Sequence, residues 1–359
     1  MSRKIKVVGL SFDHMHMGDL LRMCHEHPEV EIVGIADPEP AAMAAAISRF
    51  SIGSDAVFAD YVECAEKTRP DLAIICSATG KHADYAENIA PYVGAMLVEK
   101  PFASSLADAD RIIAAASKHG CRLLVNWPLA WYPCHRTAHR LIMEGVIGDV
   151  WQVHYYDGNR GPLRHIAGKE EVSAAEAEKL KSESWWYQKA TGGGSLNDYL
   201  GYGVTLGTWF HGGKAPVEVT CVAYVPTGME VDEHTITVAR YDTGLSKFET
   251  RWGTFTDPWT LQPQPKCGFV IVGSEGTISS YDYEPTITLQ TRSNPTAHPV
   301  PVDESKPPYE NVIQYYTYVV LNDKTITGPI SPEISRIGQQ IVETASLSAI
   351  QNKTLPLIQ

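Results

Sequence analysis

The 359-residue sequence has no surplus of positive charge, no long apolar run and no closely paired cysteines. Its 30 lysines and arginines face 42 aspartates and glutamates, which gives a formal net charge of -12. Nucleic-acid-binding proteins usually carry a basic face, so this balance disfavours a nucleic-acid partner. No apolar stretch of the sequence approaches membrane-spanning length, so we expect no membrane partner.

The seven cysteines include no Cys-x-x-Cys motif, and their number is odd. This usage indicates reduced thiols rather than a disulfide framework. The first residues run directly into an apolar segment that is too short for the apolar region of a signal peptide. We therefore expect a cytoplasmic protein.

Histidine spacing gives little support for a metal site. His14 and His16 are two residues apart, but the sequence shows no third ligand at a spacing typical of zinc. His135 and His139 are four residues apart on a predicted helix, without the acid that follows the first histidine in metalloproteases. We predict no metal.

Strand and helix patterns alternate through the first 125 residues. The helical pattern over 106–119 begins at a capping box formed by Ser105 and Asp108 and ends at Gly120. Short apolar runs typical of strands buried on both faces lie at 5–10, 31–36, 72–77, 95–99 and 122–126. The alternation predicts a dinucleotide-binding Rossmann domain over 1–125, with a doubly wound parallel sheet.

The pattern changes after Asn126. Strand-like segments follow one another at 151–156, 217–225, 234–241, 247–252, 268–272 and 286–290. Helices are expected at 134–144, 195–210, 309–321 and 332–351. Runs of strands favour a large, mostly antiparallel open sheet. We predict an α+β domain over 126–359 for substrate binding and oligomerisation, whose C-terminal helices pack back on the Rossmann domain.

A dinucleotide site is expected where the first strand ends, because a pyrophosphate binds where a helix N-terminus follows such a strand. Counting from Gly9, the usual fingerprint would place glycines at positions 11 and 14, where this chain has Ser11 and His14. The fingerprint is therefore incomplete. A structural turn would explain Gly9 nearly as well.

Asp37 gives stronger support, because it ends the second predicted strand. A carboxylate there can accept hydrogen bonds from the adenosine ribose, although it could also cap the next helix. Glu39 follows and no cation is close, so NAD is predicted and NADP is less favoured. The other residues expected at the cofactor are Gly9, Ser11, Phe12, Ser77, Ala78, Thr79, His82, Glu99, Lys100 and Asn126.

Glu99-Lys100-Pro101 follows the fourth predicted strand. Charged residues are rare at such buried ends unless they are paired or functional, although a surface Glu99–Lys100 pair is the alternative. A triple glycine at 192–194 precedes a predicted helix on which Asp198 and Tyr202 share one face. Lys100, Asp198 and Tyr202 could together hold a substrate hydroxyl and take its proton as hydride leaves.

On these motifs, together with residues 272–277, the chain resembles the Gfo/Idh/MocA oxidoreductase family over essentially its whole length. The resemblance implies an NAD(H)-dependent dehydrogenase acting on a CH–OH group of a sugar, sugar acid or cyclitol. It implies Lys100 as the catalytic lysine, Asp198 as the acid of the family pattern and Tyr202 in place of the more usual histidine. It also implies a homodimer or homotetramer.

In this family the substrate lies over the open sheet, facing the nicotinamide. Aromatic faces suit the C–H faces of a sugar ring, and polar tips suit its hydroxyls. The candidate substrate contacts are Asn126, Trp127, Trp131, Tyr132, Arg160, His165, Trp185, Trp186 and Asn197.

Two other functions remain open. A hydrolase or lyase could retain NAD and oxidise a sugar hydroxyl transiently, using the same three residues. A non-catalytic sensor could bind a dinucleotide and a partner protein, but it would need no proton relay.

Overall fold

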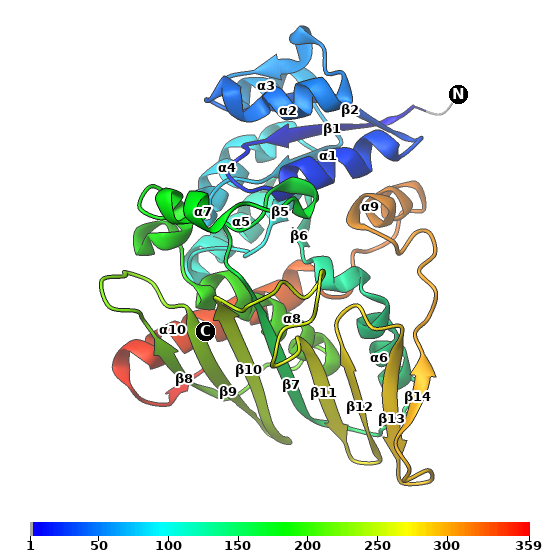
Figure 1. Cartoon of the computed structure of the whole chain (residues 1–359). Coiled ribbons are helices and arrows are strands. Elements are labelled where there is room, and N and C mark those ends of the chain that lie inside the picture. Colours follow the sequence, from blue (N-terminus) through cyan, green and yellow to red (C-terminus); the bar gives the residue numbers. More distant parts are fainter. Residues whose placement is uncertain (1–2) are drawn as a thin grey trace.

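The computed structural model describes residues 3–359, and its strands form two sheets that lie one above the other (Figure 1). The first sheet is parallel and has the order β3-β2-β1-β4-β5-β6. Its strands are β1 (Ile5–Leu10), β2 (Val30–Ala36), β3 (Val57–Phe58), β4 (Leu72–Ile75), β5 (Ala95–Glu99) and β6 (Arg122–Asn126). The predicted doubly wound parallel sheet is confirmed.

The helices between these strands are α1 (His16–Glu26), α2 (Pro40–Phe50), α3 (Tyr61–Thr68), α4 (His82–Ile89) and α5 (Leu106–His119). The predicted signals at the ends of α5 are both present. The side chain of Ser105 accepts a hydrogen bond from the Asp108 N–H, and Gly120 adopts a left-handed conformation with φ of 68°. Glycine takes this conformation without steric cost, so α5 ends where the chain must turn.

The second sheet has the order β14-β13-β12-β11-β7-β10-β9-β8-β15. Only the β7–β10 pair is parallel among its described strands, so the prediction of a mostly antiparallel sheet is confirmed. The strands are β7 (Val150–Asn159), β8 (Glu218–Tyr224), β9 (His234–Tyr241), β10 (Gly244–Trp252), β11 (Gly268–Gly273), β12 (Gly276–Tyr281), β13 (Thr286–Thr291), β14 (His298–Pro301) and β15 (Leu355–Pro356).

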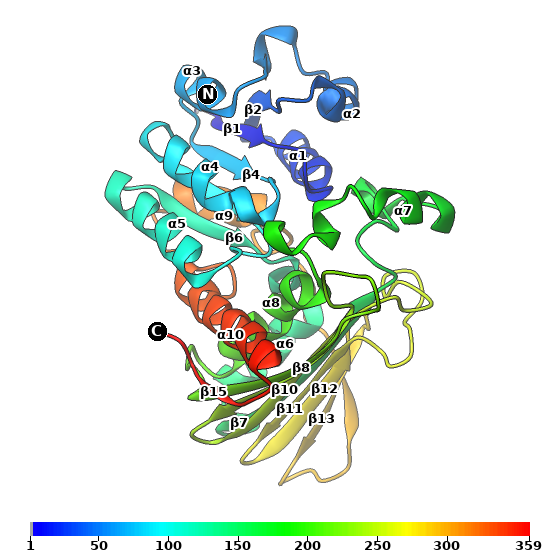
Figure 2. The same cartoon turned by 90° about the vertical axis from the view of Figure 1, so that its left-hand side faces the viewer.

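Helices cover one face of this second sheet (Figure 2). α8 (Gly201–Phe210) follows a π-helical turn at Leu196–Leu200, so the predicted helix over 195–210 is present but wider at its start. α8 lies close to the sheet because Gly203 and Gly207 face Phe248 of β10. A Cβ atom on Gly207 would lie 2.7 Å from Phe248 Cζ, so a larger residue does not fit.

The remaining helices are α6 (Pro133–Met143), α7 (Ala174–Leu180), α9 (Val312–Leu321) and α10 (Pro332–Gln351). α10 packs between α5 on one side and α8 and β8 on the other, and α9 lies beside α1, although both helices come last in the chain. Arg336 of α10 forms an ion pair with Asp110 of α5 (Nε–Oδ1 2.6 Å), and Tyr316 of α9 donates a hydrogen bond to the Asp71 carbonyl (2.7 Å). Because α10 also packs on α8 and β8, it joins the helices of the first sheet to the second sheet. The domain division at residue 125 stays a prediction.

No helix within residues 3–359 combines the length and the apolar character that crossing a membrane would require.

Replacing Gly207 by alanine tests the close contact between α8 and β10. Glycine to alanine normally stabilises a helix, because alanine has the higher helix propensity. Here the added methyl group meets the buried Phe248 ring, and overpacking costs about 1–3 kcal/mol. We expect Gly207→Ala to lower the free energy of unfolding, measured by urea denaturation. An increase in stability would contradict the contact.

Candidate active site

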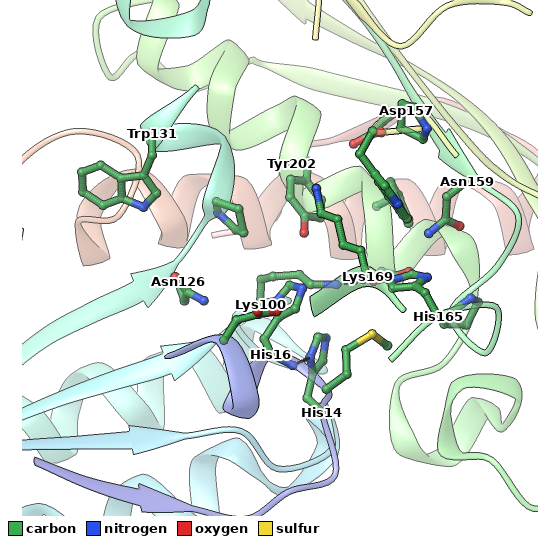
Figure 3. Close-up of a pocket in the computed structure, with 18 of the residues that line it drawn as sticks. His14, His16, Lys100, Asn126, Trp131, Asp157, Asn159, His165, Lys169 and Tyr202 are labelled. Atoms are coloured by element: carbon green, nitrogen blue, oxygen red, sulfur yellow. Dashed lines mark hydrogen bonds and ion pairs between the residues drawn. The ribbon is translucent and has the colours of Figure 1, made fainter. Parts of the chain in front are cut away.

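A cavity of about 520 Å³ lies between the two sheets. His14, His16, Lys100 and Asn126 enter it from the carboxyl edge of the first sheet. Asp157, Asn159 and Tyr202 face them from β7 and α8 (Figure 3). The carboxyl ends of parallel strands are where ligands bind in such sheets, so the cavity has the location of a ligand site.

Lys100 lies at the cavity wall directly after β5. Its Nζ is 2.6 Å from Asp198 Oδ1, and both side chains are buried, at 6% and 4% exposure. The other oxygen, Oδ2 of Asp198, accepts a hydrogen bond from the Trp252 indole N–H at 3.0 Å. Trp252 therefore fixes Asp198, and Asp198 fixes the lysine amine. The alternative of a surface Glu99–Lys100 pair is wrong, because both residues are buried and Lys100 is paired with Asp198.

Tyr202 lies beside this ion pair, and Lys100 Nζ is 5.4 Å from the centroid of its ring. Burial, followed by the charge of Asp198, raises the pKa of the Tyr202 hydroxyl well above its usual value. The side chain is therefore a neutral phenol at pH 7 and can donate a proton or a hydrogen bond. The three residues that the sequence proposed as a catalytic group thus meet at one wall of the cavity.

Two carboxyl groups lie deeper in the cavity. Asp157 and Asp282 are 8% and 3% exposed, and the Tyr155 hydroxyl donates to Asp282 Oδ2 (3.0 Å) while lying 3.5 Å from Asp157 Oδ2. Burial, followed by the charge of Asp282, raises the pKa of Asp157 well above its usual value. Asp157 is therefore a buried acid that retains its proton more readily than an exposed aspartate.

His14, His16 and Glu99 form a third polar group, next to Lys100. Burial, together with the charges of His16 and Lys100, holds the pKa of His14 well below its usual value, so its ring is neutral. Burial opposes ionisation of Glu99, but the charge of His16 and hydrogen bonds from His16 and Asn126 lower the pKa of Glu99 overall. Glu99 is therefore a buried carboxylate.

The edge of the first sheet carries features that fit a dinucleotide. Asp37 accepts hydrogen bonds from the Phe12 N–H (2.7 Å) and the Glu39 N–H (2.8 Å), one at each oxygen, and each oxygen keeps a second lone pair. Ser77 Oγ and Thr79 Oγ1 are buried without a partner in the described chain. Buried hydroxyls are normally paired, so a ligand with its own polar atoms fits here.

The turn after β1 differs from a glycine fingerprint in its hydrogen bonds. Ser11 takes the left-handed conformation (φ 66°) that glycine usually supplies. The His14 N–H donates to the Cys76 carbonyl, and the His16 N–H donates to His14 Nδ1. The N–H groups of His14 and His16 therefore donate within the protein and are not available to a ligand. The hydroxyls of Ser77 and Thr79 have no partner in the described chain and are available.

Two models of one protein family match the chain. The model described as "Oxidoreductase family, NAD-binding Rossmann fold" matches residues 3–127, and "GFO/IDH/MocA C-terminal domain" matches residues 135–279. The chain belongs to the GFO/IDH/MocA oxidoreductase family. The resemblance inferred from Glu99-Lys100-Pro101 and the triple-glycine motif is confirmed, and with it the NAD-binding class of the first domain.

Curated relatives of this family match the chain over part of their length. Inositol 2-dehydrogenase of Salmonella typhimurium is 26% identical over 171 residues, which are 45% of this chain and 48% of that protein. D-apiose dehydrogenase of Paraburkholderia graminis is 29% identical over 118 residues, 33% of this chain and 31% of that protein. The chain thus spans between about a third and a half of these two relatives.

Solved structures share the fold over nearly the whole chain. Levoglucosan dehydrogenase, in complex with NADH and levoglucosan, has a TM-score of 0.78 at 17% identity and covers 99% of this chain and 100% of its own. Aldose-aldose oxidoreductase from Caulobacter crescentus has a TM-score of 0.79 at 16% identity, with the same coverage of both chains. The chain therefore shares its fold with these structures over nearly its whole length.

The cavity brings together many of the candidate residues and leaves out others. It is lined by Lys100, Asn126, Trp131, Tyr132, His165, Trp186, Asp198 and Tyr202. Four candidate substrate contacts lie outside its lining: Trp127, Arg160, Trp185 and Asn197. The cofactor roles of the edge residues stay predictions.

Each of the four excluded side chains has another partner. The Trp127 indole is 2% exposed and donates to Ser335 Oγ (3.1 Å). Arg160 forms ion pairs with Asp257 (2.7 Å) and Glu171 (2.6 Å). The Trp185 ring stacks on Trp186 at 3.7 Å, and the Asn197 amide donates to the Gly193 carbonyl (3.0 Å). Packing and local pairing therefore decide their positions.

Two candidate cofactor residues are also engaged within the protein. The ring nitrogens of His82 lie 3.1 Å and 3.0 Å from the carbonyls of Phe102 and Ser77, so His82 ties two loops together. Gly9 lies under α1, where a Cβ atom would be 2.8 Å from Met17 Sδ, so its small size serves helix packing.

Several lining residues were missed from the sequence, notably His14, Asp157, Asn159, Lys169 and Asp282. The sequence places Asp157 and Asn159 after a strand that is expected to end at residue 156. β7 in fact runs to Asn159, and the alternation of buried positions continues through Asp157. Side chains of a strand alternate between its two faces, so a strand that continues past residue 156 would place Asp157 on the same buried face as Val153 and Tyr155. Asp282, at the end of the unpredicted β12, offered no comparable signal.

The raised pKa of Asp157 predicts a specific dependence of stability on pH. The folded state binds this proton more tightly than the unfolded state, whose aspartate pKa is about 3.9. Stability from this group is therefore lost as pH rises from about 4 toward the folded-state pKa. Asparagine cannot ionise, so we expect the Tm of Asp157→Asn to rise relative to the wild type between pH 4.5 and pH 8.

Asp303 provides a matched control, because hydrogen bonds from Arg140, opposed by burial, lower its pKa. Stability from Asp303 is lost only as pH falls below about 4, so the Tm difference between Asp303→Asn and the wild type should stay nearly constant between pH 4.5 and pH 8. If the difference in Tm between Asp157→Asn and the wild type is the same at pH 4.5 and at pH 8, the raised pKa of Asp157 is contradicted.

Proposed function

We propose that this chain is an NAD(H)-dependent oxidoreductase that transfers hydride between nicotinamide and a hydroxyl carbon of a sugar, sugar acid or cyclitol. The observation that carries the proposal is the buried Lys100–Asp198 ion pair, which holds an amine at the wall of the cavity between the two sheets. Relatives named as dehydrogenases of inositol and of D-apiose support the choice of substrate class.

The cofactor would be held at the carboxyl edge of the first sheet. When bound, NAD supplies the ring that accepts or returns the hydride. Asp37 would accept hydrogen bonds from the adenosine ribose, and Ser77 and Thr79 would donate from their unpaired hydroxyls. A 2′-phosphate would meet the carboxylates of Asp37 and Glu39, which supports NAD over NADP.

Lys100 Nζ is the atom proposed to exchange a proton with the substrate oxygen. In alcohol oxidation the amine takes the hydroxyl proton, and in carbonyl reduction the ammonium returns it. Asp198 keeps the amine in one position, since its second oxygen is fixed by Trp252. The neutral Tyr202 phenol can donate a hydrogen bond to the same oxygen and so orient the reacting carbon.

The rest of the cavity suits a ring that carries several hydroxyl groups. Trp131, Trp186 and Trp259 present aromatic faces, which pack against C–H faces of sugars. Asn159 and Asp157 present polar atoms that can accept or donate to hydroxyls. This mixture of aromatic and polar lining supports a polyol substrate.

A second candidate is supported by Asp157. A glycosidase or lyase that retains NAD needs an acid to protonate the leaving oxygen after transient oxidation of the sugar. Asp157 lines the same cavity, and burial raises its pKa well above the usual value, so it holds a proton more tightly than an exposed aspartate does. Net release of NADH during turnover excludes this second function, whereas turnover without NADH release supports it.

We also propose a homodimer or homotetramer in the cytoplasm. Figure 2 shows that one face of the second sheet carries no helix of the described chain. Residues on that face alternate with the buried ones and are 38–70% exposed: Val222, Tyr224, Ile236, Val270 and Tyr281. An apolar sheet face of this kind is suited to a second subunit. The seven free cysteines support a reducing compartment.

Lys100→Met tests the proposed proton exchange. Methionine keeps the length of the side chain and removes the amine, so we expect kcat to fall about 10²–10⁴-fold while NAD binding is retained. The measurement is NADH formation with a panel of sugars, sugar acids and cyclitols, beside an NAD titration by tryptophan fluorescence.

Lys169→Met is the matched comparison, because Lys169 also lines the cavity but lies over the rings of Trp259 and Tyr283. Its loss should raise KM more than it lowers kcat. Full turnover by Lys100→Met would rule out the proposed role of the amine.

Asp37→Ser tests the assignment of the cofactor. Serine can still accept a hydrogen bond in the turn, but it has no charge to repel a 2′-phosphate. We expect the ratio of NADP to NAD affinity to rise about tenfold or more, since removal of a repulsive group relaxes specificity. Titration of both cofactors against wild type and variant measures this ratio, and an unchanged ratio would contradict the ribose role of Asp37.

A further inference from the structure

The strand order of the first sheet reverses between β1 and β4, which are neighbours in the sheet although β2 and β3 come between them in the sequence. In open sheets of this class a dinucleotide crosses the carboxyl edge at that switch point, and its pyrophosphate lies at the N-terminus of the helix after β1. Residues 11–18 follow β1 and residues 77–79 follow β4. Their polar groups therefore decide how the two phosphates are held.

The backbone N–H groups after β1 are already used within the chain. In a glycine fingerprint such groups point at the pyrophosphate. Here the His14 N–H donates to the Cys76 carbonyl at 3.0 Å, and the His16 N–H donates to His14 Nδ1 at 3.1 Å. The other N–H groups of this turn that donate within the chain are those of Ser11, Phe12, Asp13, Met17 and Gly18. The usual backbone cradle for a phosphate is therefore largely closed.

A backbone donor after β4 is closed in the same way. The Ala78 N–H donates to Asp13 Oδ2 at 2.9 Å, and Lys81 Nζ lies 3.0 Å from the same oxygen. Lys81 therefore balances the charge of a carboxylate that would otherwise repel a phosphate. On both sides of the switch point, backbone N–H groups are paired with acceptors of the protein itself.

His14 offers a side-chain donor in their place. Burial, followed by the charges of His16 and Lys100, lowers the pKa of His14, so the ring is neutral. Since Nδ1 accepts the His16 N–H, the ring proton is on Nε2. The residue is 2% exposed, its ring points from the turn after β1 into the cavity (Figure 3), and Nε2 has no partner in the described chain. A buried donor without an acceptor is costly, and an oxygen of a bound ligand would supply the acceptor.

Two hydroxyls lie on the other side of the switch point. Ser77 Oγ and Thr79 Oγ1 are buried without a partner among residues 3–359, and the two residues are 1% and 2% exposed. The bond from the His14 N–H to the Cys76 carbonyl ties the turn after β1 to the residue that precedes Ser77. Three unpaired side-chain donors therefore flank the point where a dinucleotide crosses the sheet.

We propose that His14 Nε2–H, together with the hydroxyls of Ser77 and Thr79, donates hydrogen bonds to the pyrophosphate oxygens of the bound dinucleotide and replaces the backbone amides of the glycine fingerprint. The inference rests on the proposed function, because it concerns the same cofactor. Phosphate oxygens only accept hydrogen bonds, and bonds to such charged acceptors are stronger than those between neutral groups. A glycine at position 14 would have no side chain to donate, so the proposal also accounts for the histidine there.

Binding of ADP-ribose to the full chain tests the proposal, because ADP-ribose keeps the pyrophosphate of NAD and lacks the nicotinamide. Both ligands are titrated by calorimetry. His14→Phe removes the donor and keeps an aromatic ring against Trp186, whose ring centroid is 5.1 Å from that of His14. We expect His14→Phe to weaken ADP-ribose and NAD by a similar factor of about 10–100, as for the loss of a hydrogen bond to a charged group.

Three further variants complete the test. His14→Gln restores a side-chain N–H and should bind ADP-ribose about tenfold more tightly than His14→Phe. Ser77→Ala removes only a hydroxyl and should weaken ADP-ribose about tenfold. His165→Phe is the matched control, because His165 also lines the cavity with a buried, unpartnered ring nitrogen but follows β7 of the second sheet. It should bind ADP-ribose as the wild type does. Circular dichroism and Tm establish that each variant is folded.

Unchanged ADP-ribose affinity in either His14→Phe or Ser77→Ala would overturn the proposal. So would a loss in His14→Phe that is confined to NAD, because it would place the His14 donor at the nicotinamide. If the wild type binds neither ligand, the proposed function fails together with this inference. If the wild type binds both and His14→Phe binds them equally well, only this inference fails.

Discussion

The ion pair between Lys100 and Asp198 joins the two halves of the site. Lys100 follows a strand of the first sheet, and Asp198 lies in the π-helical turn that leads into α8 over the second sheet. A buried charge is stable only with its partner in place, so the pair requires both sheets to hold one relative position. The packing of α10 against α5 on one side and against α8 and β8 on the other supplies that constraint. The position of the proposed reacting amine depends on it.

Buried carboxyl groups distinguish the cavity from an ordinary cleft. Asp198, Asp157, Asp282 and Glu99 all lie within or beside it, and the protein stabilises each in a different way. Asp198 is paired with a lysine, the pKa of Asp157 is raised by burial, and Asp282 has the hydrogen bonds of Tyr155 and His135. Glu99 lies 2.9 Å from His16 Nδ1 and accepts a hydrogen bond from the Asn126 amide.

The close packing of α8 against β10 positions Tyr202. Because Gly203 and Gly207 bring the helix onto the Phe248 ring, the start of α8 reaches the cavity beside Lys100. Larger residues at the two glycines would lift the helix and move Tyr202 away from the amine. Packing along α8 thus sets the geometry of the site.

Much of this architecture could be predicted from the sequence. Apolar runs, helix caps and the Glu99-Lys100-Pro101 motif are local signals, and they indicated the parallel sheet, α5, α10 and the three residues around Lys100. The full length of β7 was missed because a tyrosine-rich strand and a following Asp-Gly have the composition of a strand and a turn. Asp157 was missed with it.

The sequence by itself determined which elements form and which strand ends carry charged side chains, because these depend on periodicity and capping within a few residues. Only the tertiary structure decided which side chains meet. Trp127, Arg160, Trp185 and Asn197 have the chemistry of substrate contacts, but burial and nearer partners hold them outside the cavity. His16 and Glu99 come together across 83 residues of chain. Contacts between such distant segments depend on how the sheet is wound, and no local pattern in the sequence indicates them.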